Sequence, residues 1–365
     1  MVKDISIYIH FPYCRSRCPY CDFFRALKPK VFDERELAER YLADLDGFLP
    51  YLAGRDVKSV FFGGGTPSIL SPSVVGQVLD GIAERLPVCS GAEISLEANP
   101  NTFEREKFLA FRKAGINRLS LGVQALNAAD LKFLGRTHSL EEALQAMELG
   151  VAAFPKFSVD LIYARPHQRW EDWQKEIDLA LSFGLKHISL YQLTIEDGTV
   201  FARKNITGLD EELAASLYEQ TVFYLRSRGL ERYEVSNFAA SGSESVHNLV
   251  YWQGGDYIGL GDGAHGRFSA GGKIFATVDG RIAEELISAE RAEELLLMGL
   301  RIKRGINAAA FKQACGADLF TFVNRAAMDM LVRQGLLAVD NEGIRLTDTG
   351  FLLLDEIVCR LVSDC

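Results

Sequence analysis

Three cysteines close to the N-terminus have the spacing of a metal-binding cluster. Cys14, Cys18 and Cys21 form a C-x3-C-x2-C motif directly after an apolar run over residues 5–12. Thiolates are soft ligands that proteins use for iron–sulfur clusters, zinc and copper. A buried free cysteine usually serves packing, but it is rarely one of three in such a short loop. The motif therefore indicates a metal centre.

The number of thiols separates the candidate metals. A structural zinc site takes four ligands, usually in two separated pairs. The loop supplies three, and His10 is a candidate fourth ligand that lacks the usual short-loop partner. A [4Fe-4S] cluster held by three cysteines leaves one iron open for an exogenous ligand, so we favour the cluster. We interpret the remaining cysteines as structural or incidental: Cys89, Cys315, Cys359 and Cys365.

The spacing also resembles the signature of the radical S-adenosylmethionine (SAM) superfamily. In that superfamily the open iron binds SAM through its amino and carboxylate groups. The resemblance thus implies two cofactors, a [4Fe-4S] cluster on the three cysteines and SAM beside it.

The elements that must position this loop follow a repeated pattern. Short apolar runs alternate with amphipathic stretches over residues 1–195, which is typical of βα units around a parallel sheet. The expected strands cover 5–10, 57–62, 93–97, 118–121, 156–162 and 187–191. Helical spacing of apolar residues predicts helices over 37–52, 71–86, 102–114, 139–150 and 170–183. Six units fall short of the eight of a closed barrel. We therefore expect an α/β fold with an open, partial (β/α)6 barrel.

The pattern changes after residue 200. We expect a helix over 210–228, short β-like pieces around 233–235 and a glycine-rich stretch over 254–261. Helices over 290–303, 307–314 and 317–334 then precede a strand pair, 336–339 and 343–346. That order predicts a C-terminal α+β domain of winged-helix type. The expected domains are residues 1–200, the extension 201–288 and the C-terminal domain 289–365.

Polar residues gather where the expected barrel strands end, which is where α/β folds place their chemistry. The second strand runs into Gly-Gly-Gly-Thr-Pro at 63–67, where missing side chains let a ligand approach the backbone; an ordinary tight turn is the alternative. Glu97 ends the third strand and can accept hydrogen bonds from ribose hydroxyls, or be a solvated strand end. Gln124, Arg136 and Asp160 lie at the next strand ends. We expect all of them to surround one face of one barrel.

The ordered set of motifs resembles one branch of the superfamily over nearly the whole chain. The motifs are YIHFP at 8–12, the cysteine motif, GGGTP at 63–67, EANP at 97–100, GVQ at 122–124, LGRTH at 134–138 and VDLIYARP at 159–166. This set is similar to the coproporphyrinogen dehydrogenase (HemN-like) family and, within it, to heme chaperones of the HemW type. The resemblance implies that the cofactor-binding residues around SAM are Tyr8, Tyr20, Gly64, Gly65, Thr66, Glu97, Gln124, Arg136 and Asp160.

One position separates the two branches of that family. The dehydrogenases carry a further cysteine two residues after the last cluster ligand. Here Phe23 stands at that position. The replacement argues against coproporphyrinogen oxidase activity.

A second discriminator is the run H-N-x-x-Y-W at 247–252, which resembles a signature of the chaperone branch. A neutral imidazole can ligate heme iron, and Tyr and Trp offer flat faces to a porphyrin. His247, Tyr251 and Trp252 are therefore heme candidates, and His265 is a second candidate ligand. The alternative is that His247 is a hydrogen-bonded structural histidine beside two packing aromatic residues.

Two functions stay open. The preferred one is a heme chaperone that binds heme and passes it to acceptor hemoproteins such as respiratory enzymes. The alternative is an oxygen-independent coproporphyrinogen III dehydrogenase, which decarboxylates propionates by SAM-dependent radical chemistry. Whether the chain is an enzyme therefore stays open.

Composition restricts the partners and the compartment. The chain has 365 residues, 48% hydrophobic and 24% charged, as expected of a soluble globular protein. A net charge of −9 argues against a nucleic-acid partner. No basic leader and no apolar run of membrane-spanning length are present, and seven cysteines do not make a disulfide framework. We expect a cytoplasmic protein with heme and heme-accepting proteins as partners, no integral membrane segment, and a homodimer as one candidate state.

Overall fold

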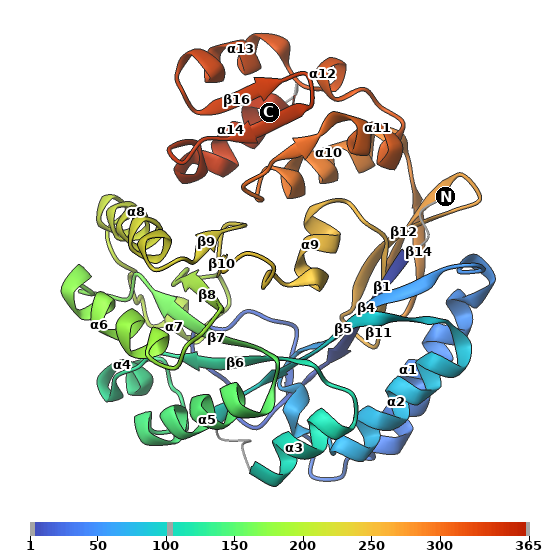
Figure 1. Ribbon diagram of the computed structural model, residues 1–365, viewed down its shortest axis with the longest axis vertical. Coiled ribbons are helices and arrows are strands. Elements are labelled where there is room, and N and C mark those ends of the chain that lie inside the picture. The colour runs from blue at the N-terminus through green and yellow to red at the C-terminus, as the bar shows by residue number, and fades with distance from the viewer. Residues whose placement is uncertain (1–3, 101–104, 363–365) are drawn as a thin grey trace.

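One twisted sheet runs through most of the molecule (Figure 1). The computed structural model describes residues 4–100 and 105–362. Within them the large sheet has twelve strands in the order β14-β13-β12-β11-β1-β4-β5-β6-β7-β8-β10-β9. The six expected barrel strands form its centre: β1 (Asp4–Phe11), β4 (Asp56–Gly64), β5 (Val88–Ala98), β6 (Arg118–Gln124), β7 (Lys156–Tyr163) and β8 (His187–Gln192).

The barrel is open, as expected. Strands β1 and β4 to β8 are parallel and lie in chain order, but β1 pairs with β11 and β8 pairs with β10 instead of with each other. The expected class, an α/β partial barrel followed by a small α+β region, is confirmed.

Helices between the strands cover the outer face of the sheet (Figure 1). They are α1 (Glu34–Phe48), α2 (Pro72–Arg85), α3 (Arg105–Lys113), α4 (Ala128–Phe133), α5 (Leu140–Ala153) and α6 (Trp170–Leu181). The first four positions of the apolar stripe predicted over 37–52 are buried on α1, but the helix ends before Leu52. Pro50 has no backbone N–H to donate to the carbonyl of Asp46, and the chain continues as a 3₁₀ turn, η1 (Leu49–Tyr51). Residues 102–104 of the helix expected over 102–114 lie outside the described part.

The extension after the barrel adds strands to both edges of the sheet. On one side α7 (Val200–Arg203) and α8 (Glu211–Ser227) precede β9 (Glu231–Arg232) and β10 (Asn237–Ala239). On the other side the glycine-rich stretch contains β11 (Tyr257–Leu260), which lies parallel to β1. An antiparallel meander that the sequence did not predict follows: β12 (His265–Ala270), β13 (Lys273–Val278) and β14 (Arg281–Leu286). The β-like piece expected around 233–235 lies between β9 and β10.

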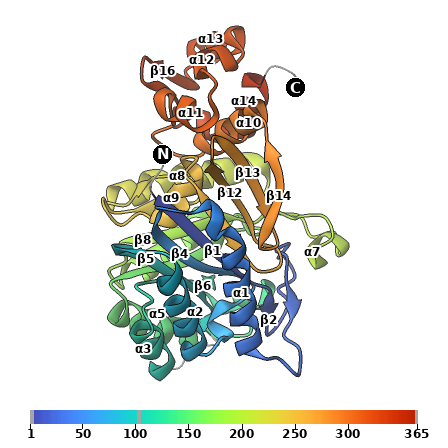
Figure 2. The ribbon, with the colours of Figure 1, turned by 90° about the vertical axis from the view of Figure 1, so that its right-hand side faces the viewer.

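The last part of the chain forms a separate layer of helices around a small sheet with the order β15-β17-β16 (Figure 2). Its elements are α10 (Ser288–Gly299), β15 (Ile306–Asn307), α11 (Ala308–Cys315), α12 (Leu319–Phe322), α13 (Arg325–Arg333), β16 (Leu337–Asp340), β17 (Gly343–Leu346), η4 (Gly350–Leu353) and α14 (Leu354–Leu361). The single helix expected over 317–334 is wrong. Val323 is extended, and the side chain of Asn324 accepts from the Ala327 N–H and starts a new helix.

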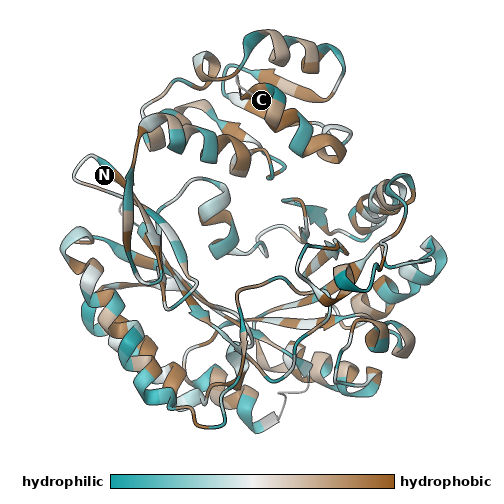
Figure 3. Cartoon of the chain, turned by 180° about the vertical axis from the view of Figure 1, so that it is seen from behind, coloured by the Kyte–Doolittle hydropathy of each residue, from teal (hydrophilic) through white to brown (hydrophobic). Residues whose placement is uncertain are grey.

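Two of the three apolar clusters in the described residues correspond to these layers. The larger lies between the barrel sheet and its helices, and the smaller joins α10, α11, α13 and α14 to the small sheet. Figure 3 shows that apolar and polar residues alternate along the C-terminal elements. Because residues 257–286 extend the barrel's own sheet, the boundary expected at residue 200 falls within one sheet, and the three-domain division stays a prediction. No helix in the described ranges is long and apolar enough to cross a membrane.

Candidate functional site

The cysteine motif lies in a loop that is fastened at both ends. Strand β2 (Tyr13–Cys14) pairs with β3 (Ala26–Leu27), and the loop between them carries Cys18 and Cys21. The backbone N–H of Ala26 donates to Pro12 O at 2.7 Å, and that of residue 28 donates to Cys14 O at 3.0 Å. The loop is thereby held at the carboxyl end of β1.

A cavity of about 360 Å³ opens beside this loop at the carboxyl ends of the barrel strands. All three cysteines line it. So do all but one of the residues predicted to surround SAM: Tyr20, Gly64, Gly65, Thr66, Glu97, Gln124, Arg136 and Asp160. The exception is Tyr8, whose side chain lies deeper in the barrel and borders a second cavity. The structure therefore brings the predicted cluster and cofactor residues to one place.

Each cysteine sulfur accepts a hydrogen bond from a nearby side chain. Thr66 Oγ1 donates to Cys14 Sγ at 3.6 Å, and Arg136 Nη1 donates to Cys18 Sγ at 3.2 Å. Arg25 Nε donates to Cys21 Sγ at 2.8 Å. Such donors orient ligand sulfurs and tune a cluster that the thiolates hold.

These thiols fit a cluster better than a single metal ion. In the described residues no three His, Cys, Asp or Glu side chains gather as the ligands of one ion. A [4Fe-4S] cluster needs no such gathering, because each cysteine binds a different iron. His10 is not available as a zinc ligand, since its Nδ1 lies 3.0 Å from Tyr8 Oη and its Nε2 lies 2.9 Å from Phe24 O.

The glycine run at 63–67 serves close packing. A Cβ on Gly64, which has φ +106°, would lie 2.6 Å from the His10 ring, and one on Gly65 would lie 2.5 Å from Tyr13 O. The three N–H groups at 64–66 already donate, to Glu97 Oε2 at 3.1 Å, Phe11 O at 2.6 Å and Tyr13 O at 2.9 Å. These three N–H groups therefore serve the protein's own hydrogen bonds, while Gly64, Gly65 and Thr66 line the cavity; the approach of a ligand to the backbone here stays a prediction.

Arg136 bridges the cluster loop and the strand ends. Besides Cys18 Sγ, its guanidinium donates to Gly122 O at 2.8 Å and to the side-chain oxygen of Asn99. The neighbouring Gly135 has φ +65° and packs against Pro19 in the cysteine loop. Gln124 ends β6 in the left-handed region, with φ 75°, a strained backbone that is typical of functional sites.

Burial raises the pKa of two carboxyl groups in the cavity wall. Burial, together with the nearby charge of Asp160, raises the pKa of Glu97 to about 8, although the N–H of Gly64 opposes the shift. Burial also raises the pKa of Asp160, against hydrogen bonds from Ser189 and Ser120. Ser120 Oγ lies 2.9 Å from Asp160 Oδ1. A protonated Glu97 can both donate and accept, which suits a ribose diol.

The heme candidates do not share one cavity. His247 and Tyr251, on α9 (Val246–Trp252), border the second cavity, of about 180 Å³, inside the barrel. Trp252 lines a third cavity, of about 300 Å³, between α9 and the C-terminal helices, next to Ile306 and Phe311. His265 is exposed at the start of β12. The structure therefore separates the H-N-x-x-Y-W run into two surroundings.

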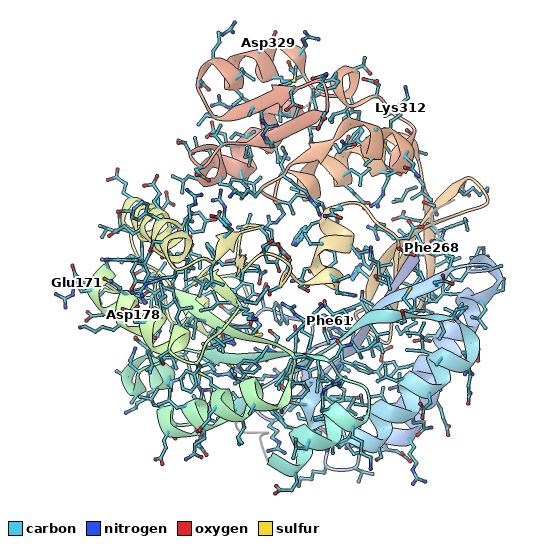
Figure 4. All side chains as sticks on the ribbon, in the orientation of Figure 1. Phe61, Glu171, Asp178, Phe268, Lys312 and Asp329 are labelled. Carbon is cyan, nitrogen blue, oxygen red and sulfur yellow. The ribbon has the colours of Figure 1, made fainter. Side chains whose placement is uncertain are left out.

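His247 is firmly held. It is 3% exposed, its Nδ1 lies 2.9 Å from Ser59 Oγ, and its ring stacks on Phe61 at 4.9 Å between centroids. Figure 4 labels Phe61, which lies on β4 where the barrel faces α9. Burial lowers the pKa of His247 to about 3, so its imidazole is neutral. Glu93 Oε1 accepts the backbone N–H of His247 at 3.2 Å and so fastens the helix to the barrel.

Some residues of the site were not predicted. Arg25 contacts Cys21 without belonging to any motif quoted above, and no sequence signal marks it. Tyr191 and Gln192, at the end of β8, line the main cavity. Their strand was predicted, so the rule that chemistry gathers at the carboxyl ends of strands could have found them.

Comparisons with known proteins agree with this geometry. The family model "Radical SAM superfamily" matches residues 8–180, and the model "HemN C-terminal domain" matches residues 286–353. The mitochondrial radical S-adenosyl methionine domain-containing protein 1 of Bos taurus is 37% identical, over 98% of this chain and 87% of the relative. The heme chaperone HemW of Escherichia coli K12 is 36% identical over 98% of each chain.

Among solved structures, coproporphyrinogen III oxidase (HemN) from Escherichia coli superposes with a TM-score of 0.82. The match covers 100% of this chain and 91% of the other. At 20% identity it shows a shared fold alone. The Escherichia coli relative named heme chaperone HemW matches over nearly the full length of both sequences. The chain therefore belongs to the radical SAM superfamily, in the family of the HemW heme chaperones, and carries a HemN C-terminal domain.

Proposed function

We propose that this protein binds heme and transfers it to heme-requiring acceptor proteins, on a radical SAM scaffold. The observation that carries the proposal is Phe23, which lines the cluster cavity and is 64% exposed. The oxidases of the resembled family have a cysteine at this position. A phenyl ring cannot ligate a metal or exchange a proton, so it removes one reactive group from the cavity. Full-length relatives named heme chaperone support the same conclusion.

The residues of the main cavity suit the two cofactors that the superfamily implies. Cys14, Cys18 and Cys21 would hold the [4Fe-4S] cluster, which, when reduced, supplies an electron to SAM. Glu97, neutral near pH 7, would hold the ribose hydroxyls as donor and acceptor. Arg136 would face the cofactor while it keeps Cys18 in place.

The proposed heme residues differ in how easily a porphyrin could reach them. Ligation by His247 requires α9 to move, because the ring is buried, fixed by Ser59 and next to a small cavity lined mostly by polar side chains. His265 is exposed and needs no such movement. Tyr251 and Trp252 stay candidates for contacts with the porphyrin faces, and binding to both at once would need their two cavities to join.

Anaerobic reconstitution tests the function directly. The holoprotein is given SAM, dithionite and coproporphyrinogen III, and products are separated by mass-resolved chromatography. In parallel, heme is titrated and the Soret band is followed. We expect a stoichiometric heme spectrum and no protoporphyrinogen IX. Repeated turnover to protoporphyrinogen IX would overturn the proposal and favour the dehydrogenase. The observation that supports this alternative is the fold shared with coproporphyrinogen III oxidase.

Variants then locate the heme. Cys14→Ala should abolish the cluster, seen as loss of its visible absorbance and iron, and should leave the heme titration unchanged, because no heme candidate lines the cluster cavity. His247→Gln and His265→Gln separate the two histidines: the variant that lacks the ligand should lose about tenfold or more in heme affinity. Unchanged spectra in both variants would remove both from the candidate list.

Acceptor transfer, a homodimer and a cytoplasmic location stay proposals. All six cysteines of the described part are free, which suits a reducing compartment. Transfer is tested by mixing heme-loaded protein with an apo-cytochrome and following the new absorbance. The oligomeric state is tested by light scattering with and without heme.

A further inference from the structure

Arg25 makes three hydrogen bonds, all with the cysteine loop. Its Nε donates to Cys21 Sγ at 2.8 Å, and its Nη2 donates to Cys18 O and to Cys21 O, both at 3.0 Å. The loop turns between these two residues, where the Cys21 N–H donates to Cys18 O at 3.3 Å. One guanidinium thus spans the turn that carries two of the three proposed cluster ligands.

The position of Arg25 is set by the chain on both sides. Its neighbours Phe23 and Phe24 are exposed, whereas Arg25 is half-buried and directed back at the loop. The next residue, Ala26, begins β3 and is fastened to Pro12. In the described part of the chain no carboxylate pairs with Arg25, so its charge faces sulfur and carbonyl oxygens.

The charge has a direct electrostatic consequence for a cluster at this place. Reduction adds one negative charge to the cluster, and a cationic donor on a ligand sulfur stabilises the reduced form more than the oxidised form. The two carbonyl contacts hold the guanidinium at the sulfur. Burial increases the effect, because solvent screens a half-buried pair less than an exposed one.

We propose that Arg25 is a positioning residue for the cluster, which closes the turn between Cys18 and Cys21 and keeps the cluster reduction potential higher than a neutral residue would. The proposal rests on the cluster that the family implies and does not depend on heme binding. A higher potential makes the reduced cluster a weaker reductant, as suits a protein that does not turn SAM over repeatedly.

The test compares Arg25→Gln with Arg17→Gln. Arg17 lies in the same loop, is exposed and donates to no cysteine sulfur of the described residues, so both variants remove one positive charge but only one removes the contact. Each holoprotein is reconstituted anaerobically, without SAM and without heme. The midpoint potential is measured by a redox titration followed by electron paramagnetic resonance, and iron release to a chelator is timed.

We expect the potential of Arg25→Gln to be more negative than that of the wild type, and its iron release to be about tenfold faster. Arg17→Gln should match the wild type in both. Equal shifts in the two variants would overturn the proposal, because charge alone would then explain them. An unchanged potential in Arg25→Gln would overturn it as well.

If Arg25→Gln retains no cluster while Arg17→Gln retains one, the potential of Arg25→Gln is not measurable. A third variant, Arg25→Lys, then decides. Lysine keeps the charge but cannot span Cys21 Sγ and both carbonyls with one planar group. Iron release faster than that of the wild type supports the proposal, because the turn is no longer closed by one group, and iron release equal to that of the wild type overturns it. Failure of heme binding would leave these results unaffected.

Discussion

Glu97 shows how the barrel adjusts a single carboxyl group. It lies at the end of β5 with the charge of Asp160 nearby, and burial raises its pKa to about 8. Near pH 7 the group is therefore mostly protonated. Its neutral form lets one cavity contain two acidic side chains without strong repulsion.

The raised pKa of Glu97 predicts how stability depends on pH. A carboxyl group whose folded pKa lies above its unfolded value binds more protons in the folded chain, so stability falls as pH rises from about 4.5 to about 8. Glu97→Gln has no titrating carboxyl group at this position, so it removes this decrease in stability with rising pH. We expect its free energy of unfolding, relative to wild type, to rise by about 3–4 kcal/mol between pH 5 and pH 8. Urea unfolding of the apoprotein measures it, and a difference that stays flat with pH would contradict the assignment.

The turn between α4 and α5 connects two parts of the site. Gly135 has φ +65°, and a Cβ there would lie 2.6 Å from Pro19 Cδ in the cysteine loop. Gly229, after α8, has φ +81°, and a Cβ there would meet no described atom within 4 Å. Alanine at either position strains the backbone, but only alanine at Gly135 also contacts the cysteine loop. Comparing the two substitutions therefore separates the effect of backbone strain from the effect of the steric contact.

Substituting both glycines tests whether this turn supports the cluster. Gly229→Ala should cost about 1 kcal/mol of stability through backbone strain alone and should load iron normally. Gly135→Ala should cost about 2–3 kcal/mol and load less iron, because Pro19 must move and shift Cys18. Urea unfolding and iron counts after reconstitution give both numbers. Equal iron loading in the two variants would show that the turn does not support the loop.

Helix α9 shows how one short motif can be divided between two surroundings. His247, Tyr251 and Trp252 lie within one short helix, but 3.6 residues per turn place the first and the last about 140° apart. The first and second are four residues apart and share a face, and the structure places them at the same cavity. The separation of Trp252 could therefore have been predicted once the segment was recognised as a helix.

At the scale of the whole molecule, Asp348 joins the C-terminal layer to the barrel extension. It accepts hydrogen bonds from Arg232 Nη2 at 2.8 Å and Arg226 Nη2 at 3.1 Å. Arg232 is 2% exposed, and its guanidinium lies 3.6 Å from the centroid of the Phe351 ring. A buried cation with few partners depends strongly on each of them.

Asp348→Asn should loosen this junction. Loss of the carboxylate leaves Arg232 with less compensation, and we expect a cost of about 1–3 kcal/mol. Asp340→Asn is the control, because its partner Arg345 is exposed in the same layer and such pairs contribute under about 1 kcal/mol. Chemical unfolding measures stability, and hydrogen exchange should quicken in 350–361 for Asp348→Asn only. A similar loss of free energy of unfolding in both variants would contradict the role of Asp348 as the residue that joins the two layers.

The parts of the fold that local sequence encodes were predictable. The six barrel strands are short apolar runs bounded by turns, and the cysteine motif is local by nature. The break between α12 and α13 was not predictable from periodicity, because apolar residues continue at helical spacing through Val323. The pairing of β11 with β1 joins distant segments, and the outward residues of β14 are polar and exposed, so neither carries a strong strand signal.

That distant pairing has a consequence for how the protein is made. Strand β1 leads into the cysteine loop and is synthesised before β11, whose Tyr257 pairs with Ser6. At about 5–20 residues per second, the edge of β1 stays uncovered for on the order of 10–50 seconds. An uncovered strand edge invites pairing with other chains. The strand edge beside the cysteine loop is therefore covered only after residues 7–256 have been synthesised.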